Sequence, residues 1–236
     1  MPPSHPNQLS LADIPAFAHL NAAVIAALES ISIRYPLRAG EVLYHVGTEA
    51  RAFYVVLAGG LRLLEYTPGG TRVSLKLYGP GELFGLLAIS GPYAHPSEVQ
   101  ALCASQVLAI NGSDTRHLME RFPALSLTVL DLLVTHIHRA HARVWQMGAE
   151  RVEIRLARAL IQLVEKFGQP DGDAITIAAP ISQRDLAEFT ATTVESVNRT
   201  LRTWKEAGIL TWTRQNLDIN DLAALHDLLE AEAAAH

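Results

Sequence analysis

The chain is poor in the residues on which several classes of protein depend. It has a single cysteine, Cys103, so no disulfide can form within the chain, and an iron–sulfur cluster or metal site held only by cysteines is excluded. No apolar run approaches the length of a membrane span. The first eight residues, MPPSHPNQ, lack the basic and apolar pattern of a signal peptide, so we expect a soluble, cytoplasmic protein.

Positive charge is also scarce. The 236 residues carry a net charge of −5, which argues against non-specific coating of nucleic acid. Sequence-specific binding is not excluded, because a local basic face is enough for it. The chain also lacks a glycine-rich phosphate loop, an HExxH metal motif and a nucleophile elbow, so we do not expect an enzyme. The composition, 49% hydrophobic, is that of a globular protein with a core.

Two short helices joined by a tight turn are predicted in residues 181–209. Ser182 can cap the first helix, with Asp185 as its reciprocal partner. Thr192 and Glu195 form the equivalent pair for the second helix. This pattern is typical of a helix-turn-helix, whose second helix enters the major groove of DNA.

The second of these helices, predicted over residues 193–207, has two distinct faces. Val197, Leu201 and Trp204 follow at spacings of four and three and predict a buried stripe. The polar face consists of Glu195, Asn198, Arg199 and Arg202. Arginine can bind guanine, glutamate can accept from cytosine, and asparagine can pair with adenine. The alternative is an ordinary helical hairpin whose polar face is merely solvated.

Residues 34–110 have a different pattern, in which short β-prone runs alternate with glycines. The runs are 42–46, 52–57, 61–66, 72–77 and 98–110. Regular short strands with turn signals predict a small antiparallel barrel or roll. A short helix with a loop is expected over residues 85–94. Cys103 lies in the last run, where we expect a small core residue rather than a redox sensor.

Helical patterns flank the roll. Residues 9–32 predict one or two helices, with Pro15 able to begin the second. A long helix is predicted over residues 123–148, with a heptad-like seam of Leu127, Leu130, Val134, Ile137, His141, Val144 and Gly148. The seam predicts a homodimer, and the alternative is a helix packed on its own domain.

The remaining C-terminal elements complete a winged helix-turn-helix. The predicted elements are a helix over 150–167, strands over 174–177, 209–213 and 217–219, and a last helix over 221–235. Arg214, between the last two strands, can reach a phosphate. The predicted fold is therefore α+β in three parts: a sensor roll over 1–120, a dimerisation helix over 121–149, and a winged helix-turn-helix over 150–236.

These three parts together resemble the CRP/FNR family of bacterial transcription regulators. The motifs that carry the resemblance are AGEVLYHVG (39–47), FYVVLAGGLRLLEYTPGG (53–70), GPGELFG (79–85), RLARAL (155–160) and VESVNR (194–199). The resemblance implies that the roll is a jelly roll of the cyclic-nucleotide-binding type. It also implies a homodimer that binds a near-palindromic operator and is reset by an effector or redox event in the roll. Relatives recruit RNA polymerase or block it, and activation is the commoner outcome.

The candidate DNA-contacting residues follow from the polar face and from this resemblance. They are Ser182, Gln183, Thr193, Val194, Glu195, Asn198, Arg199, Arg202 and Arg214. Family members read a TGA-like core with the glutamate and arginine that match Glu195 and Arg199. Asn198 and Val194 depart from the family pattern, so the outer bases of each half-site should differ. Ala191 replaces the usual turn glycine, and a positive φ there would cost about 1 kcal/mol.

The sensing half departs further from the family pattern. The candidate effector-pocket residues are Phe84, Gly85, Leu86, Leu87, Pro96, Ser97, His136, Ala140 and His141. Leu86 stands where cyclic-nucleotide-binding members carry a ribose-binding glutamate, and Pro96 where they carry a phosphate-binding arginine. Burying a phosphate without a cation is costly, so we do not expect cyclic AMP in the usual mode. The segment around His95, Pro96 and Ser97 is similar to the FNR branch, but without its cysteine cluster.

Several effectors stay open. The family includes haem-based sensors of carbon monoxide or nitric oxide, and His136, His138 and His141 on the long helix are candidate axial ligands. The alternative is that these histidines are solvent-facing or packing residues; His45 and His95 are further candidates. A small organic effector, or none, is equally compatible with the sequence. A ligand-binding adaptor without DNA binding is a further alternative, against which Glu195 and Arg199 count.

Overall fold

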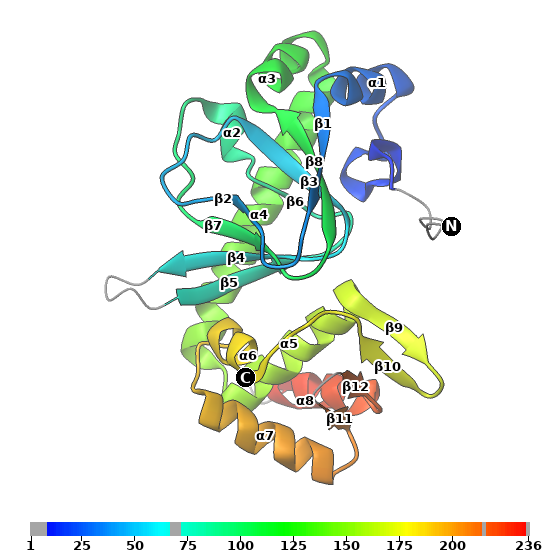
Figure 1. The fold of residues 1–236 in the computed structure, drawn as a ribbon, viewed down its shortest axis with the longest axis vertical. Helices are drawn as coiled ribbons and strands as arrows, with labels where there is room; N and C mark the ends of the chain where they lie inside the picture. Colours follow the sequence, from blue (N-terminus) through cyan, green and yellow to red (C-terminus); the bar gives the residue numbers. More distant parts are fainter. Residues whose placement is uncertain (1–8, 67–71, 214–215, 235–236) are drawn as a thin grey trace. The chain divides into compact units, whose positions relative to one another are not determined.

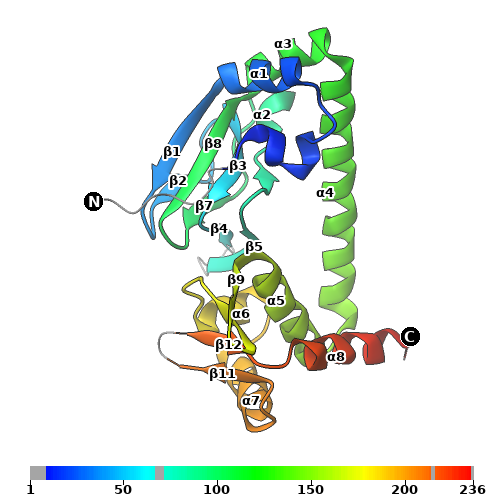
Figure 2. The ribbon, with the colours of Figure 1, turned by 90° about the vertical axis from the view of Figure 1, so that its right-hand side faces the viewer.

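The computed structural model describes residues 9–66, 72–213 and 216–234, and Figures 1 and 2 show how its elements follow one another along the chain. The chain divides into two compact units, one comprising residues up to 65 together with 77–140, and the other 66–76 together with 141–236. Within the described ranges, no helix combines the length and the apolar character that a membrane span requires.

The N-terminal half is built from short strands and flanking helices. The strands are β1 (Ser32–Leu37), β2 (Val42–Tyr44), β3 (Ala52–Ala58), β4 (Leu61–Tyr66), β5 (Arg72–Tyr78), β6 (Leu83–Phe84), β7 (Glu98–Ala101) and β8 (Ser105–Asn111). The helical elements are the 3₁₀ turns η1 (Leu11–Asp13) and η2 (Pro15–Phe17), then α1 (Ala22–Ser30), α2 (Leu87–Ser90), α3 (Gly112–Arg121) and the long α4 (Pro123–Ala149). In the described residues, the strands form two four-stranded sheets, ordered β1-β8-β3-β6 and β2-β7-β4-β5.

Strand β8 lies between β1 and β3 and pairs antiparallel with both. Its register with β1 runs from Ser32 opposite Ile110 to Leu37 opposite Ser105. Strand β3 is apolar on both faces because both faces are covered. One face contributes Val56 to a cluster that also contains Leu37, Leu61, Tyr78, Phe84, Val99, Ala101 and Val107, drawn from both sheets. The other face packs, through residues such as Val55 and Leu57, against the helices that precede and follow the roll.

The C-terminal half begins with α5 (Val152–Phe167), whose Leu156, Leu160 and Leu163 are fully buried. The further elements are β9 (Gly168–Asp171), β10 (Ala174–Ile177), α6 (Gln183–Phe189), α7 (Val194–Glu206), β11 (Leu210–Trp212), β12 (Leu217–Ile219) and α8 (Leu222–Ala234). The strands form an antiparallel sheet ordered β11-β12-β10-β9. Helix α8 packs on α5, and α6 packs on α7, so the helix-turn-helix is followed by a β-hairpin wing (Figure 1).

The predicted α+β class is confirmed, with several local differences. Residues 9–32 form two 3₁₀ turns and one α-helix, and Pro15 begins the second turn. Four elements were not predicted: strands β1, β6 and β9 and helix α3. The run over residues 98–110 is two strands, so the prediction that Cys103 lies in a strand as a core residue is wrong: it is half-buried in the turn between β7 and β8. The Ser105 hydroxyl donates to the Cys103 carbonyl at 2.9 Å and stabilises that turn.

Candidate nucleic-acid interface

Helix α6 begins at the predicted cap. The Ser182 hydroxyl accepts the backbone N–H of Asp185 at 3.1 Å, and the Ser182 N–H donates to the Asp185 carboxylate at 2.9 Å. The reciprocal capping box is therefore confirmed, and it satisfies donors that a helix start otherwise leaves without partners. Ser182 is exposed and Gln183 is half-buried at this end of the helix.

The turn between α6 and α7 holds a non-glycine residue in the left-handed region. Ala191 has a φ of +51°, and no other non-glycine residue in the described part of the chain has a positive φ. The Thr192 N–H donates to the Ala187 carbonyl at 2.9 Å and closes the turn. On α5, the Arg155 guanidinium donates to the Thr190 carbonyl at 2.9 Å. The turn is therefore held both by its own backbone and by α5.

The cap of helix α7 lies one residue later than predicted. The cap is Thr193, whose hydroxyl accepts the backbone N–H three residues later at 3.2 Å, so the predicted pair of Thr192 and Glu195 is wrong. The reason is that Thr192 still belongs to the turn. The first extended residue, with φ −89° and ψ 151°, is Thr193, and the capping residue of a helix has that backbone conformation.

The two faces of α7 differ as predicted. Val197, Leu201 and Trp204 are 0%, 4% and 2% exposed, so the buried stripe is confirmed. The exposed face carries Glu195, Asn198, Arg199 and Arg202. None of these four side chains makes a hydrogen bond or ion pair with any residue that the structure describes. Helix α7 therefore presents donors and acceptors that are available to an external partner.

The other predicted contact residues lie around this face. Thr193 is exposed and uses its hydroxyl in the cap, and Val194 is exposed at the first position of α7. Arg214 falls outside the described residues. Ser182 and Gln183 approach from the start of α6. The structure thus brings the described members of the predicted set to the start and exposed side of the helix-turn-helix.

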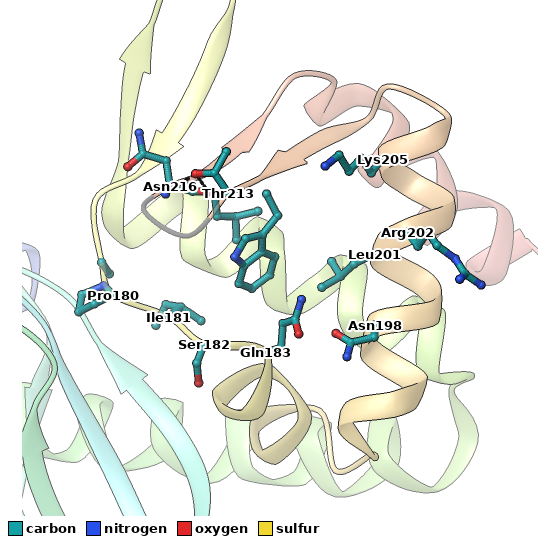
Figure 3. Close-up of a pocket in the computed structure, with 13 residues that line it drawn as sticks. Pro180, Ile181, Ser182, Gln183, Asn198, Leu201, Arg202, Lys205, Thr213 and Asn216 are labelled. Atoms are coloured by element: carbon teal, nitrogen blue, oxygen red, sulfur yellow. Dashed lines mark hydrogen bonds between the residues drawn. The ribbon is translucent and has the colours of Figure 1, made fainter.

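A cavity of about 720 Å³ lies beside this face, between α7, the segment 179–183 and the wing. Figure 3 shows Gln183 from α6, Asn198 from α7 and Asn216 from the wing among the side chains around it. The full lining is Ala179, Pro180, Ile181, Ser182, Gln183, Asn198, Leu201, Arg202, Lys205, Trp212, Thr213, Asn216 and Leu217. The lining includes two cationic side chains and no carboxylate, so the cavity favours an anion.

Sequence reasoning missed four polar or aromatic residues of this lining. They are Lys205, Trp212, Thr213 and Asn216. Lys205 follows Arg202 by three residues, so helical spacing could have placed both on one side of α7. The wing residues carry no comparable local signal, because only the packing of the wing beside α7 makes them part of a cavity.

An ionic and hydrogen-bond network links the α4–α5 corner to the helix-turn-helix. Glu150, between these helices, is buried and forms an ion pair with Arg158 at 2.6 Å. Arg155 donates to the Glu150 carbonyl at 2.7 Å and, through its other nitrogen, to the Thr190 carbonyl. Of the two arginines of the RLARAL motif, Arg158 therefore holds Glu150, and Arg155 joins the same corner to the end of α6 in the helix-turn-helix.

The candidate effector residues of the roll border a buried aromatic cluster. Phe84 lies against Tyr54 and Tyr78, with ring centroids 5.2 and 4.7 Å apart. Gly85 has a φ of +76°. Leu86 and Leu87, which follow it at the start of α2, are half-buried. Aromatic side chains thus fill much of the space next to this segment.

The position that resemblance assigns to a cyclic phosphate is acidic in this structure. Ser97 is buried, and its hydroxyl donates to the Glu65 carboxylate at 3.2 Å. The adjacent Pro96 is exposed and has no N–H to donate. An anion here would face a carboxylate instead of a cation, so these residues do not fit a cyclic nucleotide held through its phosphate.

The histidines have separate surroundings. The candidates on α4 are all exposed: His136, His138, Ala140 and His141. His45 Nδ1 lies 2.7 Å from the Glu98 carboxylate. His95 is buried and stacks on Tyr44 with ring centroids 3.6 Å apart, and burial lowers the pKa of the His95 imidazole. Over the described residues, no three potential metal ligands come together.

Comparison with known proteins links both halves of the chain to one group. Residues 35–122 match the cyclic nucleotide-binding domain, and residues 154–228 match the Crp-like helix-turn-helix domain. The chain is 25% identical to the cyclic AMP receptor protein of Thermus thermophilus, over 80% of this chain and 84% of that protein. It is 26% identical to the fumarate and nitrate reduction regulatory protein of Vibrio cholerae, over 89% of this chain and 84% of that one.

A solved structure supports the fold. The FixK2 structure from Bradyrhizobium japonicum superposes with a TM-score of 0.74 at 22% identity, and the match covers 84% of this chain and 97% of that one. Two matched domains in this order, together with relatives along most of the length, define the family. The chain belongs to the CRP/FNR family of transcription regulators, with a domain of the cyclic-nucleotide-binding type followed by a Crp-like helix-turn-helix DNA-binding domain.

Proposed function

We propose that this regulator is a homodimer that binds a near-palindromic operator with α7 of each protomer in the major groove. The observation that carries the proposal is the face of Glu195, Asn198, Arg199 and Arg202, which is exposed and has no partners within the described structure. Exposed, uncompensated donors and acceptors opposite a buried stripe are what base-edge recognition requires.

Each side chain of the face has a proposed role. Arg199 binds the two acceptors of guanine, Glu195 accepts from cytosine and Asn198 pairs with adenine. Val194 can make only an apolar contact, for example with a thymine methyl group. The contacts proposed to position the DNA backbone come from Ser182, Gln183, Thr193, Arg202 and Arg214.

The dimer is proposed to form along α4. Four members of the predicted seam, Leu127, Leu130, Val134 and Ile137, are 62%, 55%, 44% and 53% exposed. Contiguous exposed apolar side chains at heptad spacing favour burial against a second copy of the same helix. Two-fold symmetry of the protein then matches a near-palindromic operator.

The proposed organisation is a sensor roll over 1–120, the dimerisation helix over 121–149 and the DNA-binding domain over 150–236. We place the dimer in the cytoplasm, without catalytic activity, and as a partner of RNA polymerase in activation. The effector is proposed to be something other than a cyclic nucleotide in the usual mode. The carboxylate of Glu65 beside Ser97 supports this, since it would repel a bound phosphate.

The test is Arg199→Ala, compared with wild type and with Arg51→Ala. Arg51 is an exposed arginine of the N-terminal half, paired locally with Glu49. Arg199→Ala should lose about 1–3 kcal/mol of base discrimination in each half-site while sedimenting as the same dimer. Arg51→Ala should bind as wild type. Affinity would be measured by fluorescence anisotropy on an operator selected from random duplexes. Full specific affinity in Arg199→Ala contradicts the assignment of α7.

A further inference from the structure

We propose that the cavity between α7, the segment 179–183 and the wing holds a phosphodiester of the DNA backbone beside the bases that α7 reads. Lys205 is its principal cation, and Trp212 lies against the adjoining deoxyribose. The proposal rests on the proposed DNA-binding function and extends the interface beyond the base-reading face. It adds Lys205, Trp212, Thr213 and Asn216 to the interface.

The charge of the cavity selects an anion. Lys205 and Arg202 both line it, and no lining residue is acidic. Neither cation forms an ion pair or side-chain hydrogen bond with a residue that the structure describes. In a protein with a net charge of −5, two uncompensated cations in one cavity mark a local positive site. A charge-assisted contact to a phosphate oxygen would satisfy them.

Two hydrogen bonds join Thr213 and Asn216 on the wing side of the cavity. The Thr213 N–H donates to the Asn216 carbonyl at 2.9 Å, and the Asn216 N–H donates to the Thr213 hydroxyl at 3.0 Å. Across the cavity, the side-chain amide of Gln183 has no partner within the described residues, so it can still donate. The paired wing residues and this donor already line the cavity, which lowers the entropic cost of binding.

Size and position favour a backbone segment over a free inorganic anion. The volume of about 720 Å³ is within the range of pockets for whole small molecules, about 300–1,000 Å³, so a sugar and phosphate together fill it better than a phosphate alone. Asn198 and Arg202 line the cavity and also belong to the exposed face of α7. A DNA strand lying on that face continues directly into the cavity.

The first experiment measures the affinity for a selected operator and for an unrelated duplex over a range of salt concentrations. Each neutralised phosphate contributes about 0.9 to the slope of log affinity against log salt concentration. Lys205→Ala removes one contact in each protomer, so the slope should become shallower by about 2 per dimer. Affinity should fall on the order of tenfold on both duplexes. Lys205→Arg should restore the slope, and Lys166→Ala, in the last turn of α5, is the matched control.

The second experiment locates the phosphate. A set of operator duplexes, each with one neutral methylphosphonate at a different backbone position, would be tested. At one position the substitution should lower the affinity of the wild-type protein but should not lower the affinity of Lys205→Ala further. Trp212 fluorescence, obtained as the difference between wild type and Trp212→Phe, should change when the natural duplex binds. It should not change on addition of inorganic phosphate alone.

The outcomes separate this proposal from the function on which it rests. A wild-type slope and affinity for Lys205→Ala, with specificity still lost in Arg199→Ala, overturns the cavity assignment and leaves the DNA-binding function intact. A response of Trp212 to inorganic phosphate, with no sensitive backbone position, assigns the cavity to a free anion and also overturns it. If wild type selects no operator at all, the proposed function fails first.

Discussion

Replacing Ala191 with glycine should stabilise the DNA-binding unit, although glycine usually destabilises folded proteins. Ala191 has a φ of +51°, in the left-handed region that costs an L-residue about 1–2 kcal/mol. Glycine carries no such cost there, but it loses about 0.5–1 kcal/mol more conformational entropy on folding. Ala191 is exposed, so removing its methyl group opens no cavity. The net stabilisation expected for Ala191→Gly is therefore about 0.5–1 kcal/mol.

The assay is calorimetric unfolding of the full chain, in which the transition of the DNA-binding unit is identified by its shift on addition of operator. For a unit of this size, 1 kcal/mol corresponds to about 4–8 °C in Tm, so Ala191→Gly should raise the Tm by roughly 2–8 °C. Operator affinity should not change, because the Thr192 N–H still closes the turn onto the Ala187 carbonyl.

The matched control is Ala231→Gly. Ala231 is exposed in the last turn of α8, where the same change should destabilise by up to about 1 kcal/mol. The two variants therefore remove the same methyl group but should shift the Tm in opposite directions. If Ala191→Gly lowers the Tm as Ala231→Gly does, the left-handed assignment of the turn is wrong.

Three further predictions concern the seam, the buried ion pair and a buried histidine. Leu130→Asp with Ile137→Asp should convert the proposed dimer to monomer in sedimentation and abolish operator binding, since each protomer would bury two charges in the proposed seam. Arg158→Ala leaves the Glu150 carboxylate buried and unpaired, and should destabilise the DNA-binding unit by about 3 kcal/mol in urea unfolding, whereas Glu150→Gln in that background should recover part of the loss. His95 has a pKa below its ordinary 6.5, so as the pH falls the imidazole is protonated in the unfolded chain before it is protonated in the folded chain. The free energy of unfolding should therefore be highest above about pH 7 and should fall as the pH drops through 6.5 towards the folded-state pKa. His95→Phe should lack this dependence, so equal pH profiles of stability in the two proteins would contradict the assignment.

Local patterns in the sequence were sufficient for much of the DNA-binding half. Ser182 and Asp185 were predicted as a capping box because capping depends only on residues three apart. The stripe of Val197, Leu201 and Trp204 was predicted because helical periodicity dictates which side chains share a face. The cap of α7 was misplaced by one residue because two adjacent threonines can each cap, and only the backbone conformation of the turn distinguishes them.

In the roll, the continuous β-prone pattern over residues 98–110 concealed a tight turn. Cys103 sits in that turn because the Ser105 hydroxyl bonds back to its carbonyl, a local contact that competes with strand formation and leaves no periodic signal. The Ser97–Glu65 contact was equally hidden, because it depends on the pairing of β7 with β4.

The sequence by itself therefore determined the family, the order of most elements and the polar, exposed face of α7. Each of these depends on residues within about two helical turns of one another or on motifs of neighbouring residues. Only the tertiary structure decided which side chains from distant segments lie in contact. It brought Trp212 and Asn216 of the wing beside Lys205 to form a cationic cavity, and it joined Glu150 to the helix-turn-helix through Arg155 of α5. Such contacts arise when elements pack to bury their apolar faces, and which polar side chains then meet is set by that packing and not by their spacing along the chain.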